Sequence, residues 1–263
     1  MRKPLNLSLV VLASLLVLRC NTAPENHVLG APPKLPSAAS MSIPDMQAMG
    51  AAKQSAAAET RINVGIAYAA TLFWTGVVAV ALTGPVALFE AAVHTEPVVL
   101  PDSSGYQWVL SHGGFSALLT AQDKNGSWDW KMTVMSGNNM SNFTWFTGTS
   151  SQDGSQGNWT FYRHPDGAPI HSFVYAFANS TEDVKVMIVD KGAETYGSYL
   201  HWNIDKHIKS LEGYNAQDKG SSLILYNSVS GTGKMEDRKH GNSYCWDTKF
   251  AGYADIPCSQ WHI

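Results

Sequence analysis

The stretch Trp-Asp-Trp-Lys-Met-Thr-Val at residues 128–134 alternates large apolar and polar residues without interruption. Successive side chains of a β-strand point to opposite faces, so this alternation predicts a strand with one buried and one exposed face. The same period of two recurs in other segments: Phe143, Trp145 and Thr147; Trp159 and Phe161; Phe173, Tyr175 and Phe177; Val184, Val186 and Ile188; Leu223 and Leu225. We therefore expect a β-rich domain, which we place at residues 98–263.

Turn-forming pairs separate these segments. They are Asn125-Gly126, Gly137-Asn138, Asp153-Gly154, Asp166-Gly167, Lys191-Gly192, Lys219-Gly220 and Gly231-Thr232-Gly233. Short turns join antiparallel neighbours, so this order predicts a meander. About nine or ten such strands would curl because of their twist. The expected fold class is α+β, mainly β, with an antiparallel meander curled into a half-barrel or barrel.

Residues 47–97 have the composition of helices. Residues 47–61 are rich in alanine, and residues 62–82 carry no charged side chain. We expect Gly84-Pro85 to break this segment. A membrane span or a helix at the membrane surface would also suit the uncharged run. The favoured interpretation is a buried helix or helical hairpin that the sheet wraps, because the helix needs a cover and the sheet needs a filling.

The first twenty residues predict export. Arg2 and Lys3 give a positive start, and an apolar run follows at residues 5–18. That run is too short to cross a bilayer as a helix and is typical of a signal peptide. We assign residues 1–20 to this signal.

Cys20 follows the apolar run directly, in the position of a lipid-modified cysteine. Arg19 stands where such signals have a small residue, which departs from the pattern. Lipid attachment to Cys20 is the favoured interpretation, and ordinary cleavage near Ala23 or Ala31 is the alternative. Residues 21–46 contain five prolines among small and polar residues and are predicted to form a disordered tether.

The chain has three cysteines. Exported proteins meet oxidising conditions, so we expect a disulfide between Cys245 and Cys258, which close a short loop. This pairing leaves Cys20 free for a lipid. The alternative is that all three are unpaired thiols.

Charge excludes one class of partner. Without residues 1–19 the chain loses three of its 18 basic residues and none of its 21 acidic residues, which leaves 15 against 21 and a net charge of −6. An acidic chain is a poor binder of nucleic acid. The expected partners are instead a membrane, reached through the lipid on Cys20, and a hydrophobic small molecule or an envelope protein.

Five further segments carry a resemblance. They are Gly105-Tyr106-Gln107-Trp108, His112-Gly113-Gly114-Phe115-Ser116-Ala117, Gly154-Ser155-Gln156-Gly157-Asn158-Trp159-Thr160-Phe161-Tyr162, Tyr244-Cys245-Trp246-Asp247 and Asp255-Ile256-Pro257-Cys258. In this order they resemble uncharacterised bacterial lipoproteins of the outer surface or periplasm, which join an N-terminal helical segment to a Trp-rich β-meander. The resemblance implies location in the cell envelope, most simply at the outer membrane, with secretion as the alternative. In shape these proteins resemble half-barrel lipoprotein carriers, which is an analogy of fold alone.

Two groups of polar residues have metal-binding chemistry. His201, Asn203, Asp205 and His207 would share one face of a strand, and His164, Asp166 and His171 surround a predicted turn. Ligands six residues apart on a strand lie roughly 20 Å apart, so the outer histidines need a turn between them to share an ion. Solvated polar positions are the favoured interpretation of both groups. The sequence contains no serine-hydrolase elbow, zinc-protease helix or phosphate loop, so we expect no catalytic activity, metal or cofactor.

Seven aromatic residues on the predicted strands are candidates for facing a ligand: Trp128, Trp130, Trp145, Trp159, Phe161, Phe173 and Tyr175. Aromatic side chains fill lipid-binding cavities and stack on sugars, but at a period of two they also build ordinary cores. The expected function is a lipid-anchored protein of the cell envelope that binds a hydrophobic ligand in a half-barrel. The alternatives are an interaction module that docks on an envelope complex and an exported glycan-binding protein.

Overall fold

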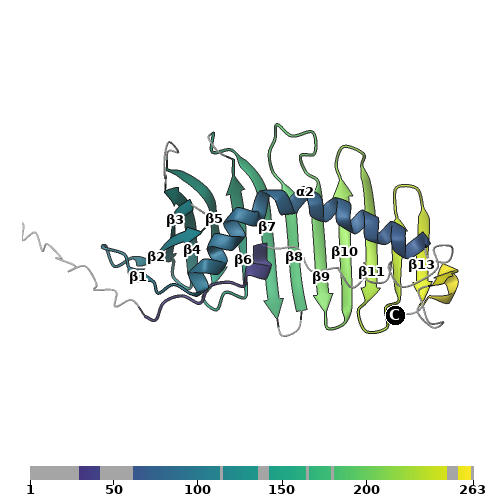
Figure 1. The fold of residues 1–263 in the computed structure, drawn as a ribbon, viewed down its shortest axis with the longest axis horizontal. Helices are drawn as coiled ribbons and strands as arrows, with labels where there is room; N and C mark the ends of the chain where they lie inside the picture. Colours follow the sequence, from purple (N-terminus) through teal and green to yellow (C-terminus); the bar gives the residue numbers. More distant parts are fainter. Residues whose placement is uncertain are drawn as a thin grey trace, which may run out of the picture.

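A computed structural model describes residues 30–41, 62–112, 115–135, 142–163, 166–178, 181–247 and 254–261. The described chain is mainly β. Its strands form one antiparallel sheet in which each strand pairs with the next along the chain (Figure 1). The predicted meander is confirmed.

The sheet contains fourteen strands in sequence order. Their bounds are β1 Val98–Val99, β2 Gly105–His112, β3 Phe115–Asp123, β4 Ser127–Met135, β5 Phe143–Ser151, β6 Gln156–Tyr162, β7 Pro169–Ala178, β8 Thr181–Ile188, β9 Tyr199–Asp205, β10 Ile208–Asn215, β11 Gly220–Asn227, β12 Gly233–Asp237, β13 Asn242–Asp247 and β14 Ala254–Ile256. Because β1 and β14 are the two edges and do not pair with each other, the sheet is not closed and the expectation of a full barrel was wrong.

The expected nine or ten strands were too few. The additional strands are very short, as β1 and β14 are, or carry polar and charged residues on their exposed face, as β10 and β12 do. Few large residues occupy the buried positions of β12, where Gly233 and Met235 alternate with charged side chains. Such segments lack the aromatic alternation that identified the central strands.

Helix α2 (Ile62–Val93) lies across one face of the sheet (Figure 1). The expected break at Gly84-Pro85 was wrong, because the helix continues through both residues. A proline inside a helix removes one backbone hydrogen bond and bends the helix, and α2 changes direction once along its length (Figure 1). Within the described part of the chain, no helix meets the length and apolarity needed to cross a membrane.

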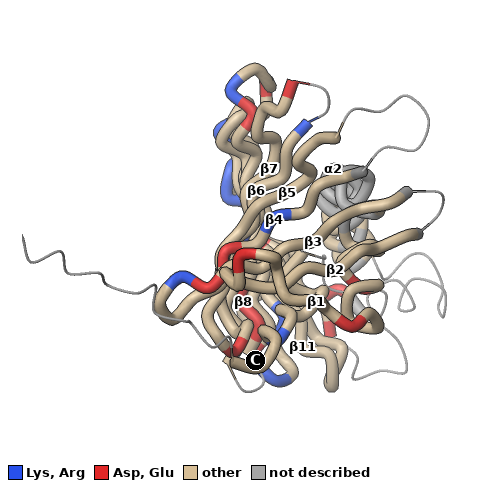
Figure 2. Tube along the Cα trace, turned by 90° about the vertical axis from the view of Figure 1, so that its left-hand side faces the viewer, with Lys and Arg blue, Asp and Glu red and all other residues tan. Residues whose placement is uncertain are grey.

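We call the face of the sheet that carries α2 the inner face and the opposite side the outer face. The inner face holds one hydrophobic core, to which α2 contributes Ala67, Leu88, Phe89 and Ala92. Along β4, Lys131 is exposed while its neighbours Trp130 and Met132 are buried, and many other charged residues lie at or near the turns (Figure 2). This division follows from the alternation of apolar and polar residues along each strand.

Glycines make room for the large rings of the core. Gly148 pairs with Trp130 on one side and Trp159 on the other, and a Cβ at residue 148 would lie 2.3 Å from the ring of Trp159. Gly233 pairs with Trp246, and a Cβ there would lie 2.1 Å from that indole. Trp159 and Trp246 therefore each lie over the backbone of a neighbouring strand, at a position where only glycine fits.

A β-bulge interrupts the predicted alternation in β5. Met132 pairs with Phe146 and Thr133 pairs with Thr144, so Trp145 is the extra residue of the bulge. The bulge brings Phe146 into the core, fully buried, and the half-buried indole of Trp145 packs against Gly84 of α2. Strict alternation had placed Trp145, not Phe146, on the apolar face.

Residues 30–41 pack against the sheet, although they lie within the predicted tether. Pro33 and Pro36 are buried, and Ser40 and Met41 in helix η1 (Ala38–Met41) are fully buried. The Ser40 hydroxyl accepts a hydrogen bond from the indole of Trp159 at 3.0 Å. The rest of the predicted tether, and the whole predicted signal with Cys20, lie outside the described residues.

Cys245 and Cys258 form a disulfide, with their sulfur atoms 2.14 Å apart. This confirms the predicted pair. The bond joins β13 to the short helix η3 (Cys258–Gln260) at the C-terminal end of the sheet.

Candidate functional site

Six of the seven candidate aromatic residues lie in the core of the inner face. These residues are at most 5% exposed: Trp128, Trp130, Trp159, Phe161, Phe173 and Tyr175. The seventh, Trp145, is half-buried against α2. The aromatic residues identified from the sequence thus form an aromatic surface on the inner face, and α2 covers part of it.

Phe89 of α2 sits at the centre of this aromatic surface. Its ring centroid lies 6.4 Å from Trp130, 6.2 Å from Phe146 and 5.5 Å from Trp159, each at a steep angle. Edge-to-face contacts of this kind are favourable beyond the area they bury. In this conformation the helix occupies the space that an apolar ligand would need.

Hydrogen bonds hold the central indoles in place. Trp130 Nε1 donates to Ser150 Oγ at 2.8 Å, and Trp159 Nε1 donates to Ser40. The hydroxyl of Tyr175 has no partner of acceptable geometry among the described residues, although Ser150 lies beside it, and burial raises the pKa of this phenol. The core is therefore packed around two hydrogen-bonded indoles, whereas Trp128 Nε1, like the Tyr175 hydroxyl, has no hydrogen-bond partner among the described residues.

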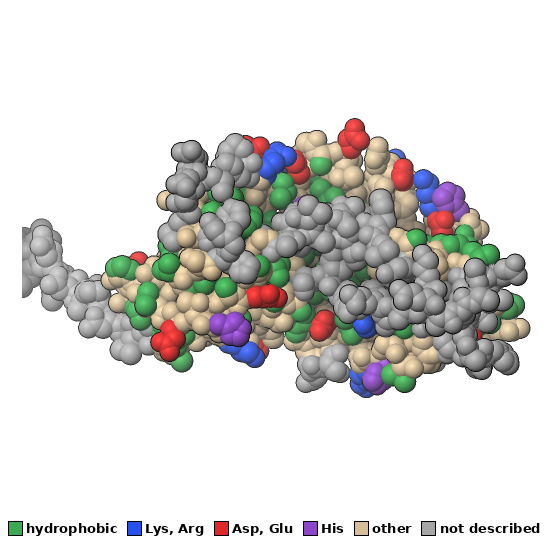
Figure 3. All heavy atoms as spheres, in the orientation of Figure 1, with side chains coloured by type: hydrophobic (Ala, Val, Ile, Leu, Met, Phe, Trp, Pro, Cys, Tyr) green, Lys and Arg blue, Asp and Glu red, His purple; other side chains and the backbone are tan. Residues whose placement is uncertain are grey.

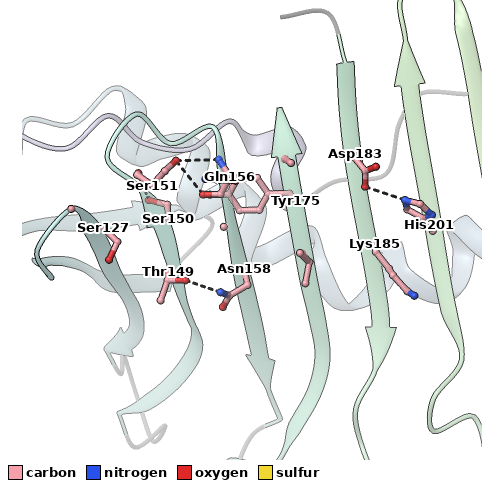
Figure 4. A pocket seen from close by; sticks show the side chains of 14 residues that line it. Ser127, Thr149, Ser150, Ser151, Gln156, Asn158, Tyr175, Asp183, Lys185 and His201 are labelled. Carbon is pink, nitrogen blue, oxygen red and sulfur yellow. Dashed lines mark hydrogen bonds and ion pairs between the residues drawn. The ribbon is translucent and has the colours of Figure 1, made fainter. Parts of the chain in front are cut away.

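A groove of about 810 Å³ crosses the outer face (Figure 4). One row of in-register residues from five consecutive strands runs through its lining: Thr149, Asn158, Val174, Lys185 and His201. Neighbouring strands are about 4.8 Å apart, so this row extends about 19 Å from β5 to β9. The groove is therefore long and runs perpendicular to the strands.

The side chains of the groove form polar pairs across adjacent strands. Asn158 Nδ2 donates to Thr149 Oγ1 at 2.6 Å. Asp183 Oδ1 lies 3.0 Å from His201 Nε2 (Figure 4). The other carboxylate oxygen of Asp183 accepts a hydrogen bond from Asn203 Nδ2 at 3.2 Å. Amide, hydroxyl, carboxylate and imidazole groups together offer both donors and acceptors along the groove.

Two further residues add a cation and an apolar contact. Lys185 Nζ lies 3.9 Å from the centre of the Tyr199 ring, which holds the ammonium beside the groove. The Val174 side chain is 58% exposed at the middle of the row. The groove can thus contact the apolar side of a ligand while its polar groups satisfy hydroxyl or amide groups.

The predicted polar clusters have separate roles. Asp205 ends β9 and Lys206 follows with a φ of 53°, so the suspected turn between His201 and His207 is present. His201 instead contacts Asp183, on a strand that the metal hypothesis had not considered. Among the described residues, no group of three His, Cys, Asp or Glu side chains could hold a metal ion.

The second predicted cluster does not form one site. Asp166 forms an ion pair with Arg163 at 3.0 Å, and Arg163 also contacts Asp190 at 2.8 Å. His171 Nδ1 is buried without a partner among the described residues, and burial lowers the pKa of this histidine. His164 lies outside the described residues.

A smaller cavity of about 480 Å³ lies between the N-terminal segment and the β5–β6 turn. One of its two acidic residues, Asp153, accepts hydrogen bonds from the hydroxyls of Ser151 at 2.6 Å and Ser155 at 2.7 Å, which lower the pKa of Asp153 to about 2. Because this carboxylate is already hydrogen-bonded within the turn, it is less available to a ligand than the polar side chains of the groove.

Sequence reasoning missed most of the groove. Thr149, Asn158, Asp183 and Lys185 occupy partly or fully exposed strand positions, and among the polar residues of the groove only His201 had been a candidate metal ligand. The signal that unites them is strand register, because each belongs to one of two adjacent rows across the sheet. No family model, curated protein or solved structure significantly matches the chain.

Proposed function

We propose that this chain is a lipid-anchored binding protein of the cell envelope that holds an extended, hydroxyl-rich ligand such as a glycan strand in the outer groove. The observation that carries the proposal is the in-register row from Thr149 to His201, which lines a long groove with paired polar side chains. The inner aromatic surface is a weaker candidate, because Phe89 already fills it.

The chemistry of the groove favours a sugar polymer over a compact metabolite. Asn158 and Asp183 can bond hydroxyl groups, and Val174 can contact the apolar face of a sugar ring. The row is long enough for several sugar units. Binding needs no chemical step, and we propose that the protein is not an enzyme.

The cellular setting is part of the proposal. The signal-like residues 1–18 and Cys20 support export and acylation. We also propose that the open sheet is a half-barrel that wraps α2, which would place the groove on the convex side, away from the helix. Contacts of Phe89 with three strands of the inner face support this arrangement.

Calorimetric titration with a tetrasaccharide of N-acetylglucosamine tests the binding site. We expect Asn158→Ala and Lys185→Ala each to weaken binding about tenfold, because a hydrogen bond to a charged group contributes about 1.5–3 kcal/mol and a neutral one about 1. Lys131→Ala is the matched control, since Lys131 is an exposed lysine of β4 outside the groove lining. Equal affinity in all variants, or no binding by the parent, would argue against the proposal.

A second candidate function is the binding of an apolar molecule in place of α2. The position of Phe89 among Trp130, Phe146 and Trp159 favours it, because the sheet already binds one apolar group there. Phe89→Ala should open a dry cavity and create binding of a fluorescent fatty acid. If this variant remains folded and gains no binding, the helix is a permanent part of the core.

A further inference from the structure

Four valines at one corner of the molecule are exposed. Val93 ends α2 and is 59% exposed, Val98 and Val99 form β1 and are 53% and 51% exposed, and Val109 of β2 is 58% exposed. Four residues connect Val93 to β1, and Val98 pairs with Gln107, two residues from Val109. Figure 3 shows hydrophobic side chains, interspersed with polar and charged ones, at the end of the molecule where Figure 1 places β1 and β2. We name these residues the valine corner.

The N-terminal segment reaches the sheet beside the valine corner. The hydroxyl of Tyr106 donates a hydrogen bond to the carbonyl of Gly30. Tyr106 in turn pairs with Val99 in β1. The described chain therefore begins next to two of the exposed valines.

Gly30, which contacts Tyr106, lies only a short distance along the chain from Cys20. Gly30 lies ten positions after Cys20, and ten residues span at most about 36 Å. The predicted tether of residues 21–46 would have reached much farther, but residues 30–41 are packed against the sheet. A lipid on Cys20 would hold the Tyr106 end of the sheet close to the bilayer.

We infer that the valine corner is a membrane-contact surface that inserts its side chains into the bilayer beside the lipid anchor. The inference rests on the proposed acylation of Cys20. Between Val93 and Val109 the charged side chains are the exposed acids Glu96 and Asp102, and the exposed His94 follows Val93. Attraction to anionic headgroups therefore does not drive the contact, and binding depends on burial of apolar surface.

Vesicle binding by the mature chain from residue 20 tests the inference. With Cys20→Ser the chain has no acyl group, and we expect it to bind vesicles of phosphatidylethanolamine and phosphatidylglycerol weakly and with little dependence on salt. Val98→Asp with Val99→Asp should weaken this binding about tenfold or more, because the valines contribute apolar burial and aspartate resists insertion. Val109→Asp, on the longer strand β2, should act in the same direction.

Val229→Asp is the matched control. Val229 is 71% exposed in the turn between β11 and β12, far along the sheet from β1, and its replacement should leave vesicle binding unchanged. The inference is overturned if the Val98/Val99 variant binds as well as the parent, or if the Cys20→Ser chain does not bind vesicles. Circular dichroism of each variant verifies that the sheet is intact.

Mass spectrometry of the intact protein separates this inference from the proposed anchor. An unmodified Cys20 together with valine-dependent vesicle binding would contradict the proposed anchor and support the contact surface. An acylated Cys20 with valine-independent binding would support the anchor and contradict the contact surface.

Discussion

The carboxylate of Asp255 accepts a hydrogen bond from the backbone N–H of Asn63 at 3.1 Å, although Asp255 lies 192 positions after Asn63 in the sequence. The Asn63 side chain also donates to the carbonyl of Cys245 at 2.9 Å. The C-terminal end of the sheet therefore binds the beginning of α2. Because the disulfide joins Cys245 to Cys258, it holds the segment that carries Asp255.

Replacing Asp255 should weaken the attachment of α2. An acidic group that accepts from an N–H in the first turn of a helix contributes about 1 kcal/mol. We expect Asp255→Ala to lower the free energy of unfolding in urea by about this amount. Asp123→Ala, at the exposed end of β3, is the control and should change it little. Equal losses in the two variants would show that Asp255 is an ordinary surface acid.

Removing the disulfide should lower the free energy of unfolding more than replacing Asp255 does. The cysteines are 13 residues apart, and closing a loop of this size contributes about 3 kcal/mol. We expect the double variant Cys245→Ser with Cys258→Ser to lose about this much stability in urea denaturation. Asp255→Ala should then have a smaller effect than in the parent, because the released segment no longer positions the carboxylate. Additive losses would contradict this coupling.

Two glycines should respond oppositely to alanine. Gly148→Ala places a Cβ 2.3 Å from the Trp159 ring and from the carbonyl of Asn158, and should destabilise the fold by about 2 kcal/mol or more. Gly65→Ala meets no atom within 4 Å in α2 and should stabilise it by about 0.5–1 kcal/mol. Thermal unfolding of both variants measures the difference. A tolerated Gly148→Ala would contradict the packing of tryptophan over glycine.

His171 should make stability depend on pH. Burial lowers the pKa of His171 from its ordinary value of 6.5. Below pH 6.5 the unfolded chain therefore takes up a proton that the folded protein takes up only at lower pH, so the free energy of unfolding falls as the pH falls. The loss ends once the pH is below the lowered pKa of the folded state.

His171→Gln should reduce this loss between pH 6.5 and the range where carboxylates titrate. Urea denaturation at a series of pH values measures it, and His207→Gln, at an exposed turn, is the control. An unchanged slope in His171→Gln would mean that His171 does not titrate differently in the folded and unfolded chains.

The sequence predicted the features that depend on local pattern. The alternation around Trp130 and Trp159 identified strands and their buried face, the turn pairs identified the meander, and cysteine spacing identified the disulfide. These signals need only the period of a strand or the chemistry of a neighbour in sequence.

The features that sequence reasoning missed depend on tertiary packing. Helix α2 continues through Pro85, and the bulge at Trp145 follows from the register between β4 and β5, which no local pattern specifies. The groove has the same origin. Thr149 and His201 become part of one row only when five strands pair in a particular register.

An NMR titration of the protein with the tetrasaccharide of N-acetylglucosamine tests whether an extended glycan binds along the outer groove, because backbone amide shifts locate the ligand. We predict shifts concentrated along the row from Thr149 to His201, with α2 and the Phe89 cluster unaffected. Shifts centred on the inner face and α2, or no shifts at saturating sugar, would show that the outer groove is not the binding site.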